Sequence, residues 1–232
     1  VGREGMMTET LIKENAVMDI TDVLSMKVPG EEVTVGDKII PGFTDTLITN
    51  PYGDGKTYLA PLFYGPTGLF YNSGLVGEGK TYALPETFEE LFALNETAKA
   101  NGSSLFTYPT TGYFDAFFYA LVNEVGGADF FNKAMTFDVE TWSSDTMKEV
   151  FAIVGELVSY NHPDTVAQAN NEGFTKNQQL ILDNKALFIP NGTWLPGEME
   201  KAPRAEGFEW GFTALPAVEK GGDRYSYTFF EQ

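Results

Sequence analysis

Short apolar runs alternate with helical patterns along this chain, and this alternation restricts its fold more than any other feature. The clearest helical pattern lies between Ser144 and Tyr160, where apolar side chains recur every three or four residues and so share one helix face. Strands that alternate with helices predict an α/β fold. We expect strands over residues 57–64, 68–72, 105–108, 185–190 and 209–215, and helices over 84–101, 112–125, 144–160 and 174–182, with a further helix from Trp194.

Local signals set several of these boundaries. Thr87 and Glu90 have the spacing of a capping box, which predicts the start of a helix. Gly126-Gly127 predicts the end of the aromatic-rich helix. The turn residues Gly65-Pro66-Thr67 separate two apolar runs, and we expect a crossing between two packed units at this break.

The chain is strongly acidic but has the composition of a folded protein. Its 232 residues suggest one or two domains. It carries 15 Lys and Arg against 33 Asp and Glu, a net charge of −18, which disfavours binding to nucleic acids and to anionic membranes. An apolar fraction of 43% is enough for a core, so the acidity does not indicate disorder.

Cysteine and histidine are nearly absent, which removes much catalytic chemistry. There is no Cys and one His, so thiolate catalysis, Cys-based zinc sites and His-rich metal sites are excluded. The one histidine, His162, lies at an expected helix end and we interpret it as structural. We interpret the acidic side chains Glu89, Glu90, Glu156 and Glu198 as solvated helix faces. We expect no cofactor and no metal.

Aromatic residues beside turns are the more informative signal. Tyr64 precedes Gly65-Pro66, Tyr113 and Phe114 follow Gly112, and Trp194 follows Gly192-Thr193. A Tyr or Trp ring offers a flat apolar face with a polar group attached, which suits a sugar ring. Core or hinge packing is the better explanation for any one of these residues taken alone, so only their set indicates carbohydrate binding.

The chain resembles the family 1 extracellular solute-binding proteins, the sugar-binding receptors of ABC importers. Five segments follow the order of the family's motifs: residues 59–72, 84–91, 126–127, 184–194 and 211–216. Two positions depart from the pattern, because Phe88 stands where a Trp is usual and Asn184 where a Gly is usual. Residues 191–199 and 203–208 are similar to receptors for N-acetylglucosamine and chito-oligosaccharides.

The resemblance implies a two-lobe periplasmic-binding-protein-like fold with hinge crossings. On that template residues 1–65 and 212–232 belong to the N-terminal lobe, and residues 66–211 form the C-terminal lobe. The N-terminal lobe would be incomplete, because the family has a βα segment before residue 1 and a helical segment after residue 232. We therefore expect a chain that is truncated at both ends.

The implied function is a receptor, not an enzyme, that captures a sugar or oligosaccharide between its lobes and delivers it to an ABC transporter permease. We expect a monomer on the extracellular face of the cell membrane or in the periplasm. Any membrane attachment would be through a lipid anchor outside this sequence.

Matching the family's positions gives the candidate ligand-binding residues. Trp194 is the candidate stacking platform, and Tyr113 and Phe114 form a second aromatic region. The remaining candidates are Tyr64 at the first crossing, Asp115 and Asn191 as hydrogen-bonding groups, and Glu231 near the returning crossing.

Two other functions remain open from the residues alone. One is an α/β carbohydrate-active enzyme. The other is a receptor for a non-sugar solute such as an amino acid. Amino-acid receptors often hold the ligand carboxylate with Arg, and the three arginines, Arg3, Arg204 and Arg224, lie apart from the turn aromatics in sequence.

Overall fold

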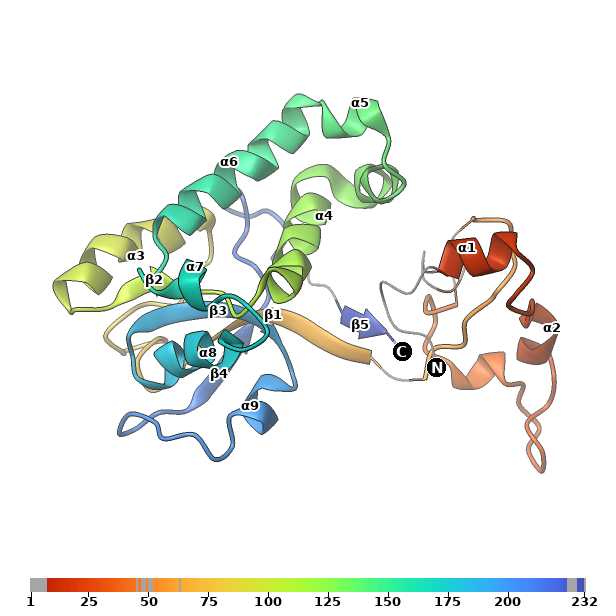
Figure 1. The fold of residues 1–232 in the computed structure, drawn as a ribbon, viewed down its shortest axis with the longest axis horizontal. Helices are drawn as coiled ribbons and strands as arrows, with labels where there is room; N and C mark the ends of the chain where they lie inside the picture. Colours follow the sequence, from red (N-terminus) through yellow and green to blue (C-terminus); the bar gives the residue numbers. More distant parts are fainter. Residues whose placement is uncertain are drawn as a thin grey trace. The chain divides into compact units, whose positions relative to one another are not determined.

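The computed structural model describes residues 8–44, 46, 49, 52–62, 64–224 and 229–231. The chain forms two compact units, Val1–Gly65 with Phe230–Gln232, and Pro66–Phe229. The ribbon in Figure 1 is coloured along the sequence, so the two units can be told apart by the residue numbers on its bar. The expected lobe boundaries, residues 1–65 with 212–232 and residues 66–211, remain a prediction.

The first unit consists of short elements joined by long turns. It contains helix α1 (Thr8–Lys13), helix α2 (Thr21–Leu24) and the 3-10 helix η1 (Gly36–Lys38). Backbone bonds tie its segments together, with Ile20 N donating to Thr57 O at 2.8 Å. The expected strand over residues 57–64 is wrong for its described residues 57–62, which are irregular.

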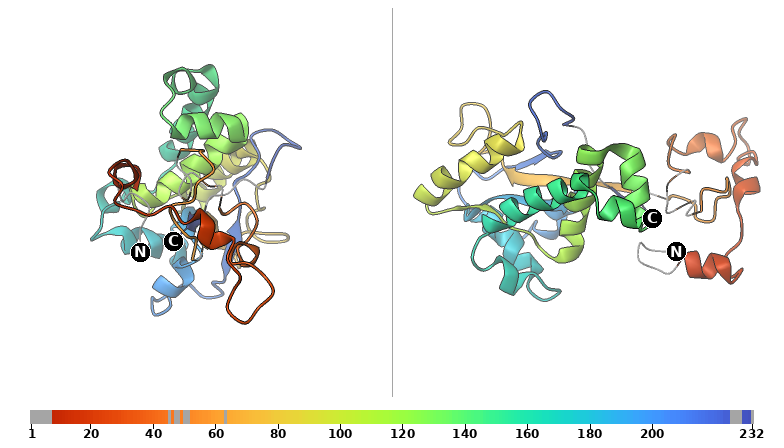
Figure 2. Two further views of the ribbon diagram at one scale, coloured as in Figure 1. Left: turned by 90° about the vertical axis from the view of Figure 1, so that its right-hand side faces the viewer. Right: turned by 90° about the horizontal axis from the view of Figure 1, so that it is seen from above.

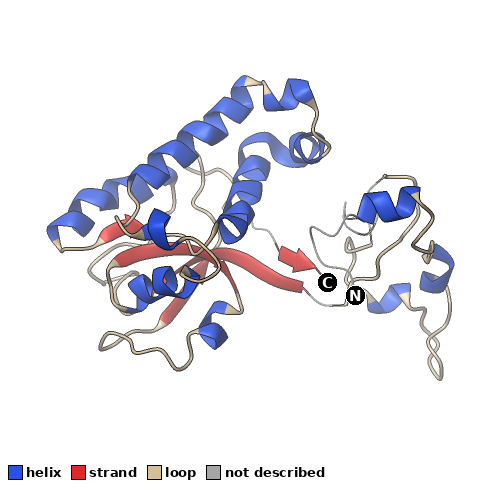
Figure 3. Cartoon of the chain, viewed as in Figure 1, coloured by secondary structure: helices blue, strands red, loops and turns tan. Residues whose placement is uncertain are grey.

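The second unit is built on a mixed β-sheet, drawn in red in Figure 3. The strand order is β2-β3-β1-β4, and β5 also pairs with β1. Strand β3 runs antiparallel to β1 and parallel to β2, and β4 runs antiparallel to β1. The bounds are β1 Tyr64–Asn72, β2 Ser104–Phe106, β3 Ala186–Gly192, β4 Trp210–Thr213 and β5 Phe229–Glu231. The α/β fold expected from the sequence is confirmed.

Strand β1 runs through the turn residues that were expected to break it. Pro66 has no N–H to give to a ladder, but its carbonyl accepts from Thr193 N at 3.1 Å. Gly68 allows β4 to approach closely, because a Cβ at this position would overlap the carbonyl of Thr213. The expected interruption of the strand at residues 65–67 is therefore wrong, whereas the boundary between the two compact units does fall here, between Gly65 and Pro66.

Helices cover both faces of this sheet. Helices α3, α4 and α6 pack on one face, and α8 and α9 pack on the other (Figures 1 and 2). None of the helices in the described part of the chain combines the length and apolarity that a membrane span needs. The bounds are α3 Phe88–Ala100, α4 Thr111–Met135, α5 Val139–Trp142, α6 Asp145–Ser159, α7 Thr165–Gln168, α8 Phe174–Leu182 and α9 Leu195–Glu198.

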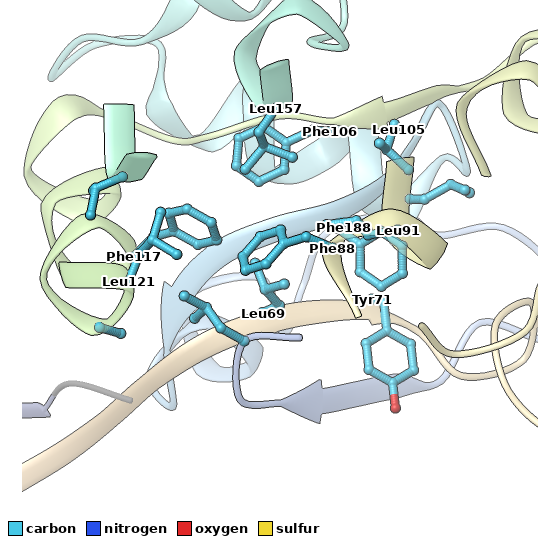
Figure 4. Close-up of a cluster of buried hydrophobic side chains, with 14 of the residues drawn as sticks. Leu69, Tyr71, Phe88, Leu91, Leu105, Phe106, Phe117, Leu121, Leu157 and Phe188 are labelled. Atoms are coloured by element: carbon cyan, nitrogen blue, oxygen red, sulfur yellow. The ribbon is translucent and has the colours of Figure 1, made fainter. Parts of the chain in front are cut away.

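Each face of the sheet has its own hydrophobic core. Leu69 and Tyr71 of β1 point into the core under α3, α4 and α6, and Phe70 between them belongs to the core under α8 and α9. This alternation follows from the period of two in a strand. Figure 4 shows the larger core, in which Phe106, Phe117 and Phe188 meet the leucines of neighbouring elements.

Side-chain caps mark the starts of α3 and α6. Thr87 accepts from Glu90 N at 3.2 Å, as the capping-box spacing predicts. The return bond differs by one residue, because the Glu90 carboxylate accepts from Glu86 N at 2.7 Å instead of from Thr87 N. Ser144 caps α6 by accepting from Met147 N at 3.1 Å.

Helix α4 extends beyond its expected end. Gly127 has a left-handed φ of 79° and interrupts the helical backbone, yet a second helical stretch follows at once and reaches Met135. The predicted end of the aromatic-rich helix at Gly126-Gly127 is therefore confirmed for the first stretch. The second stretch was not predicted, and its aromatic residues Phe130 and Phe131 pack against the core.

Candidate functional site

The end of strand β3 positions Trp194. All seven residues of β3 are buried, and the chain then turns at Thr193 so that Trp194 becomes the N-cap of α9. The indole ring lies directly over Gly192, because a Cβ added to this glycine would overlap the ring. Gly192 thus leaves the space that Trp194 occupies at the end of β3.

Two further aromatic side chains surround Trp194. Tyr113, in the first turn of α4, places its ring 5.7 Å from the Trp194 ring, at an interplanar angle of 58°. Phe174, the first residue of α8, packs edge-on to Tyr113 at 6.3 Å. All three rings are partly exposed. We call Tyr113, Phe174 and Trp194 the aromatic cluster, which brings three elements together at one place.

A chain of polar side chains leads from the buried end of β3 to this cluster. Gly192 N donates to Asn191 Oδ1 at 2.8 Å, and Asn191 Nδ2 donates to Gln178 Oε1 at 3.0 Å. Gln178 Nε2 then donates to Glu198 Oε2 at 3.2 Å. We call Asn191, Gln178 and Glu198 the polar relay. Its first two members are fully buried and its last member is exposed.

The relay reaches the aromatic cluster through Tyr113. The Tyr113 hydroxyl donates to Glu198 Oε1 at 3.5 Å, which is a long contact. Burial raises the pKa of Tyr113, and the negative charge of Glu198 raises it further. The phenol therefore stays neutral in the physiological range and keeps its proton for hydrogen bonding.

Helix α4 directs the neighbouring candidates elsewhere. Phe114 packs against the core aromatics, 5.2 Å from Tyr108 and stacked on Phe117 at 5.6 Å. Asp115 is exposed, and residues two positions apart on a helix do not face each other. The structure therefore does not bring Phe114 and Asp115 into the aromatic cluster with Tyr113.

The last two candidates belong to the first compact unit, whereas the aromatic cluster belongs to the second. Tyr64 is the first residue of β1 and is 42% exposed, with its ring 5.0 Å from Phe43 within the first compact unit. Glu231 is the last residue of β5, and its side chain is outside the described residues.

Three residues of the site were missed by sequence reasoning. Phe174 and Gln178 were read only as parts of a helix, and Glu198 only as a solvated face. Gln178 lies one turn after Phe174 on α8, and Glu198 lies one turn after Trp194 on α9, so both could reach the site that the aromatics mark. No signal in the sequence relates α8 to α9, since only the fold brings them together.

The one histidine has a local structural contact, as its sequence setting suggested. His162 N donates to Phe106 O at 2.8 Å, and its Nδ1 accepts from Asp164 N at 3.2 Å. Among the described residues no group of three or more His, Asp and Glu side chains could hold a metal ion. The aromatic cluster and relay instead suit a ligand that has an apolar face and hydrogen-bonding groups.

The chain is similar in sequence to bacterial proteins that are named for sugar binding. It is 25% identical over 191 residues to the diacetylchitobiose binding protein NgcE of Streptomyces coelicolor, covering 80% of this chain and 39% of NgcE. It is 28% identical over 186 residues to a probable sugar-binding periplasmic protein of Rhizobium meliloti, covering 79% of this chain and 43% of that protein. The chain thus spans less than half the length of these relatives.

A solved structure shows the same fold, and a family model matches almost the whole chain. A chitin oligosaccharide binding protein superposes with a TM-score of 0.68 at 21% identity, over 97% of this chain and 55% of that one. The family model described as "bacterial extracellular solute-binding protein" matches residues 5–230, which is almost the whole sequence. The chain therefore belongs to the bacterial extracellular solute-binding protein family.

Proposed function

We propose that this chain is part of a receptor that binds a sugar or oligosaccharide and delivers it to an ABC importer. The observation that carries the proposal is the aromatic cluster beside the Glu198 carboxylate. A pyranose ring has an apolar C–H face that can stack on Trp194, and it has hydroxyl groups that can donate to a carboxylate. The names of the relatives, which include a diacetylchitobiose binding protein, support the same ligand class.

The remaining parts of the proposal follow from family membership. The ligand would be held between two lobes that close by a hinge motion, and the closed form would dock on a membrane permease. The receptor would act as a monomer in the periplasm or, through a lipid anchor, on the extracellular face of the membrane. It would make and break no covalent bond.

The first test of this proposal is binding of sugars to the protein. We suggest thermal-shift and calorimetric titrations with N,N′-diacetylchitobiose, longer chitin oligosaccharides, maltose and galactose. Chromatography of each sugar after prolonged incubation tests for turnover. Binding without new products supports a receptor, whereas cleavage of a glycan would show a carbohydrate-active enzyme. Binding of amino acids but of no sugar would show a receptor for another solute.

Trp194→Ala is expected to raise the dissociation constant for the bound sugar at least about tenfold, because the stacking surface is lost. Calorimetry at matched protein concentration measures this change. If Trp194 serves only to pack the second unit, the substitution should instead cost ~3–5 kcal/mol of stability and leave the affinity unchanged.

Trp142→Ala provides the matched control. Trp142 is also partly buried in the second unit, where its Nε1 donates to Ala134 O at 2.8 Å and its ring stacks with Phe118. It lies in α5, whereas the aromatic cluster is formed by α4, α8 and the N-cap of α9. This variant should lose stability and bind the sugar as the unmodified protein does.

A further inference from the structure

The side-chain amides of the polar relay can take only one orientation, and the groups at both ends of the relay determine it. A backbone N–H can only donate, so the side-chain oxygen of Asn191 must face Gly192, and its amide nitrogen must face Gln178. A carboxylate can only accept, so the amide nitrogen of Gln178 must face Glu198. Both conditions require the same orientation of the Gln178 amide.

Burial makes this orientation rigid. Gln178 is 0% exposed and Asn191 is 1% exposed, so neither amide can exchange its protein partner for water. Reversal of either amide would leave two buried groups of the same kind facing each other. Strand β3 thereby determines, through Asn191 and Gln178, where Oε2 of the exposed Glu198 lies.

The second carboxylate oxygen of Glu198, Oε1, is not used by the relay and faces the aromatic cluster. Glu198 Oε2 accepts from Gln178, whereas within the described part of the chain Oε1 has only the long contact of 3.5 Å with the Tyr113 hydroxyl. A ligand hydroxyl can approach Oε1 more closely than this. A glutamate that is already held in place also loses less side-chain freedom when the ligand binds.

We propose that Gln178 and Asn191 are positioning residues that hold Glu198 as a hydrogen-bond acceptor for a ligand hydroxyl beside the aromatic cluster. This inference rests on the proposed function, because it assigns roles within the same sugar site. Asn191 thus acts through Gln178 and does not touch the ligand. Glu198 is the specificity residue, since it favours neutral sugars with a donor at this position over anionic ones.

A double-mutant cycle tests the relay. We expect Glu198→Gln and Gln178→Met each to raise the dissociation constant about tenfold, and the double variant to raise it about tenfold and not a hundredfold. The reason is that Gln178 contributes to binding only through Glu198. The probe is the tightest-binding member of the sugar panel, and calorimetry gives the four dissociation constants.

Two further variants guard against a trivial effect on folding. Gln178→Asn retains a buried amide that is one methylene too short to reach both neighbours, and it replaces Gln178→Met if that variant fails to fold. Gln179→Met is the matched control, because Gln179 lies on the same helix but donates to Asp183 Oδ1 and Pro203 O, both at 2.8 Å. It should leave the dissociation constant unchanged.

The outcomes separate this inference from the proposed function. Sugar binding with a strongly coupled cycle supports both. Sugar binding with additive effects overturns the relay and leaves the receptor function intact. Failure of the unmodified protein to bind any sugar of the panel overturns the proposed function and the inference together. Nuclear magnetic resonance of the Gln178 side-chain amide, which should shift in Glu198→Gln, tests the hydrogen bond without any ligand.

Discussion

At the scale of single residues, Gly192 matters because the absence of a side chain there leaves room for the Trp194 ring. Gly192→Ala would put a methyl group where the indole ring lies, so the ring must move or the strand end must shift. We expect an at least about tenfold rise in the dissociation constant for sugar, together with a stability loss of about 1–3 kcal/mol from overpacking. Calorimetry and urea unfolding measure the two effects.

Gly155→Ala is the matched control for this substitution. Gly155 lies within α6, and a Cβ there would meet nothing within 4 Å. Removing a helical glycine should stabilise the protein by about 0.5–1 kcal/mol and leave sugar binding unchanged. Sugar affinity that survives Gly192→Ala would show that the position of the indole ring does not matter for binding.

At the scale of elements, Glu124 attaches helix α4 to the segment that follows β4. Its carboxyl accepts from Val218 N at 2.7 Å, and its second oxygen is buried. Burial raises the pKa of Glu124 from an ordinary value of 4.5 to about 8, and the charge of Asp223 adds to the rise, although the bond from Val218 opposes it. The folded protein therefore holds a proton here at neutral pH.

This proton makes stability depend on pH. Between about 4.5 and about 8 the folded state binds a proton that the unfolded state has released, so the free energy of unfolding falls as pH rises. One such group contributes a slope of at most about 1.4 kcal/mol per pH unit. Below the ordinary pKa both states are protonated, and above the raised pKa both are ionised, so the contribution is flat there.

Glu124→Gln should remove this slope. The amide oxygen can still accept from Val218 N, and it carries no charge into the buried position. We expect the variant to be more stable than the unmodified protein at pH 8 and to lose that advantage at pH 5, as measured by urea unfolding across the range. Glu149→Gln on the exposed side of α6 is the control. Equal slopes in Glu124→Gln and the unmodified protein would contradict the assignment.

An element could be predicted well when residues near it in sequence determine where it begins and ends. Helix α8 matches its expected bounds, and α6 falls within its expected range of 144–160, because the apolar residues that mark a helix face lie close together in sequence. Strand β1 was misread at residues 65–67, since pairing with β3 reaches Thr67 and Thr193 N donates to Pro66 O, which keeps the strand extended here. Such pairing partners lie far away in sequence, and local signals carry no information about them.

The candidate site likewise contains residues that could be predicted from the sequence and residues that could not. Tyr113 and Trp194 were predicted from their places beside turns, and the structure brings them together. Phe114 was also predicted, but its ring packs on the core aromatics, because adjacent residues on a helix point in different directions. Glu198 could not be singled out from many similar acidic residues, since its proposed role depends on the hydrogen bond from the buried amide of Gln178.

At the scale of the whole molecule, the net charge of −18 creates a negative potential that any charged ligand would feel. A neutral sugar is not steered or repelled by this potential, so its binding should be nearly independent of salt. Salt should nevertheless raise the melting temperature, because it screens the repulsion between the acidic side chains.

We therefore expect the dissociation constant for sugar to change by less than about twofold between about 0.01 M and about 0.15 M salt, while the melting temperature rises. Calorimetry and differential scanning measure these two quantities on the same samples. A cationic ligand would bind several-fold more weakly at the higher salt concentration, and an anionic ligand several-fold more tightly. Either dependence would contradict a neutral sugar as the ligand and would favour a receptor for a charged solute.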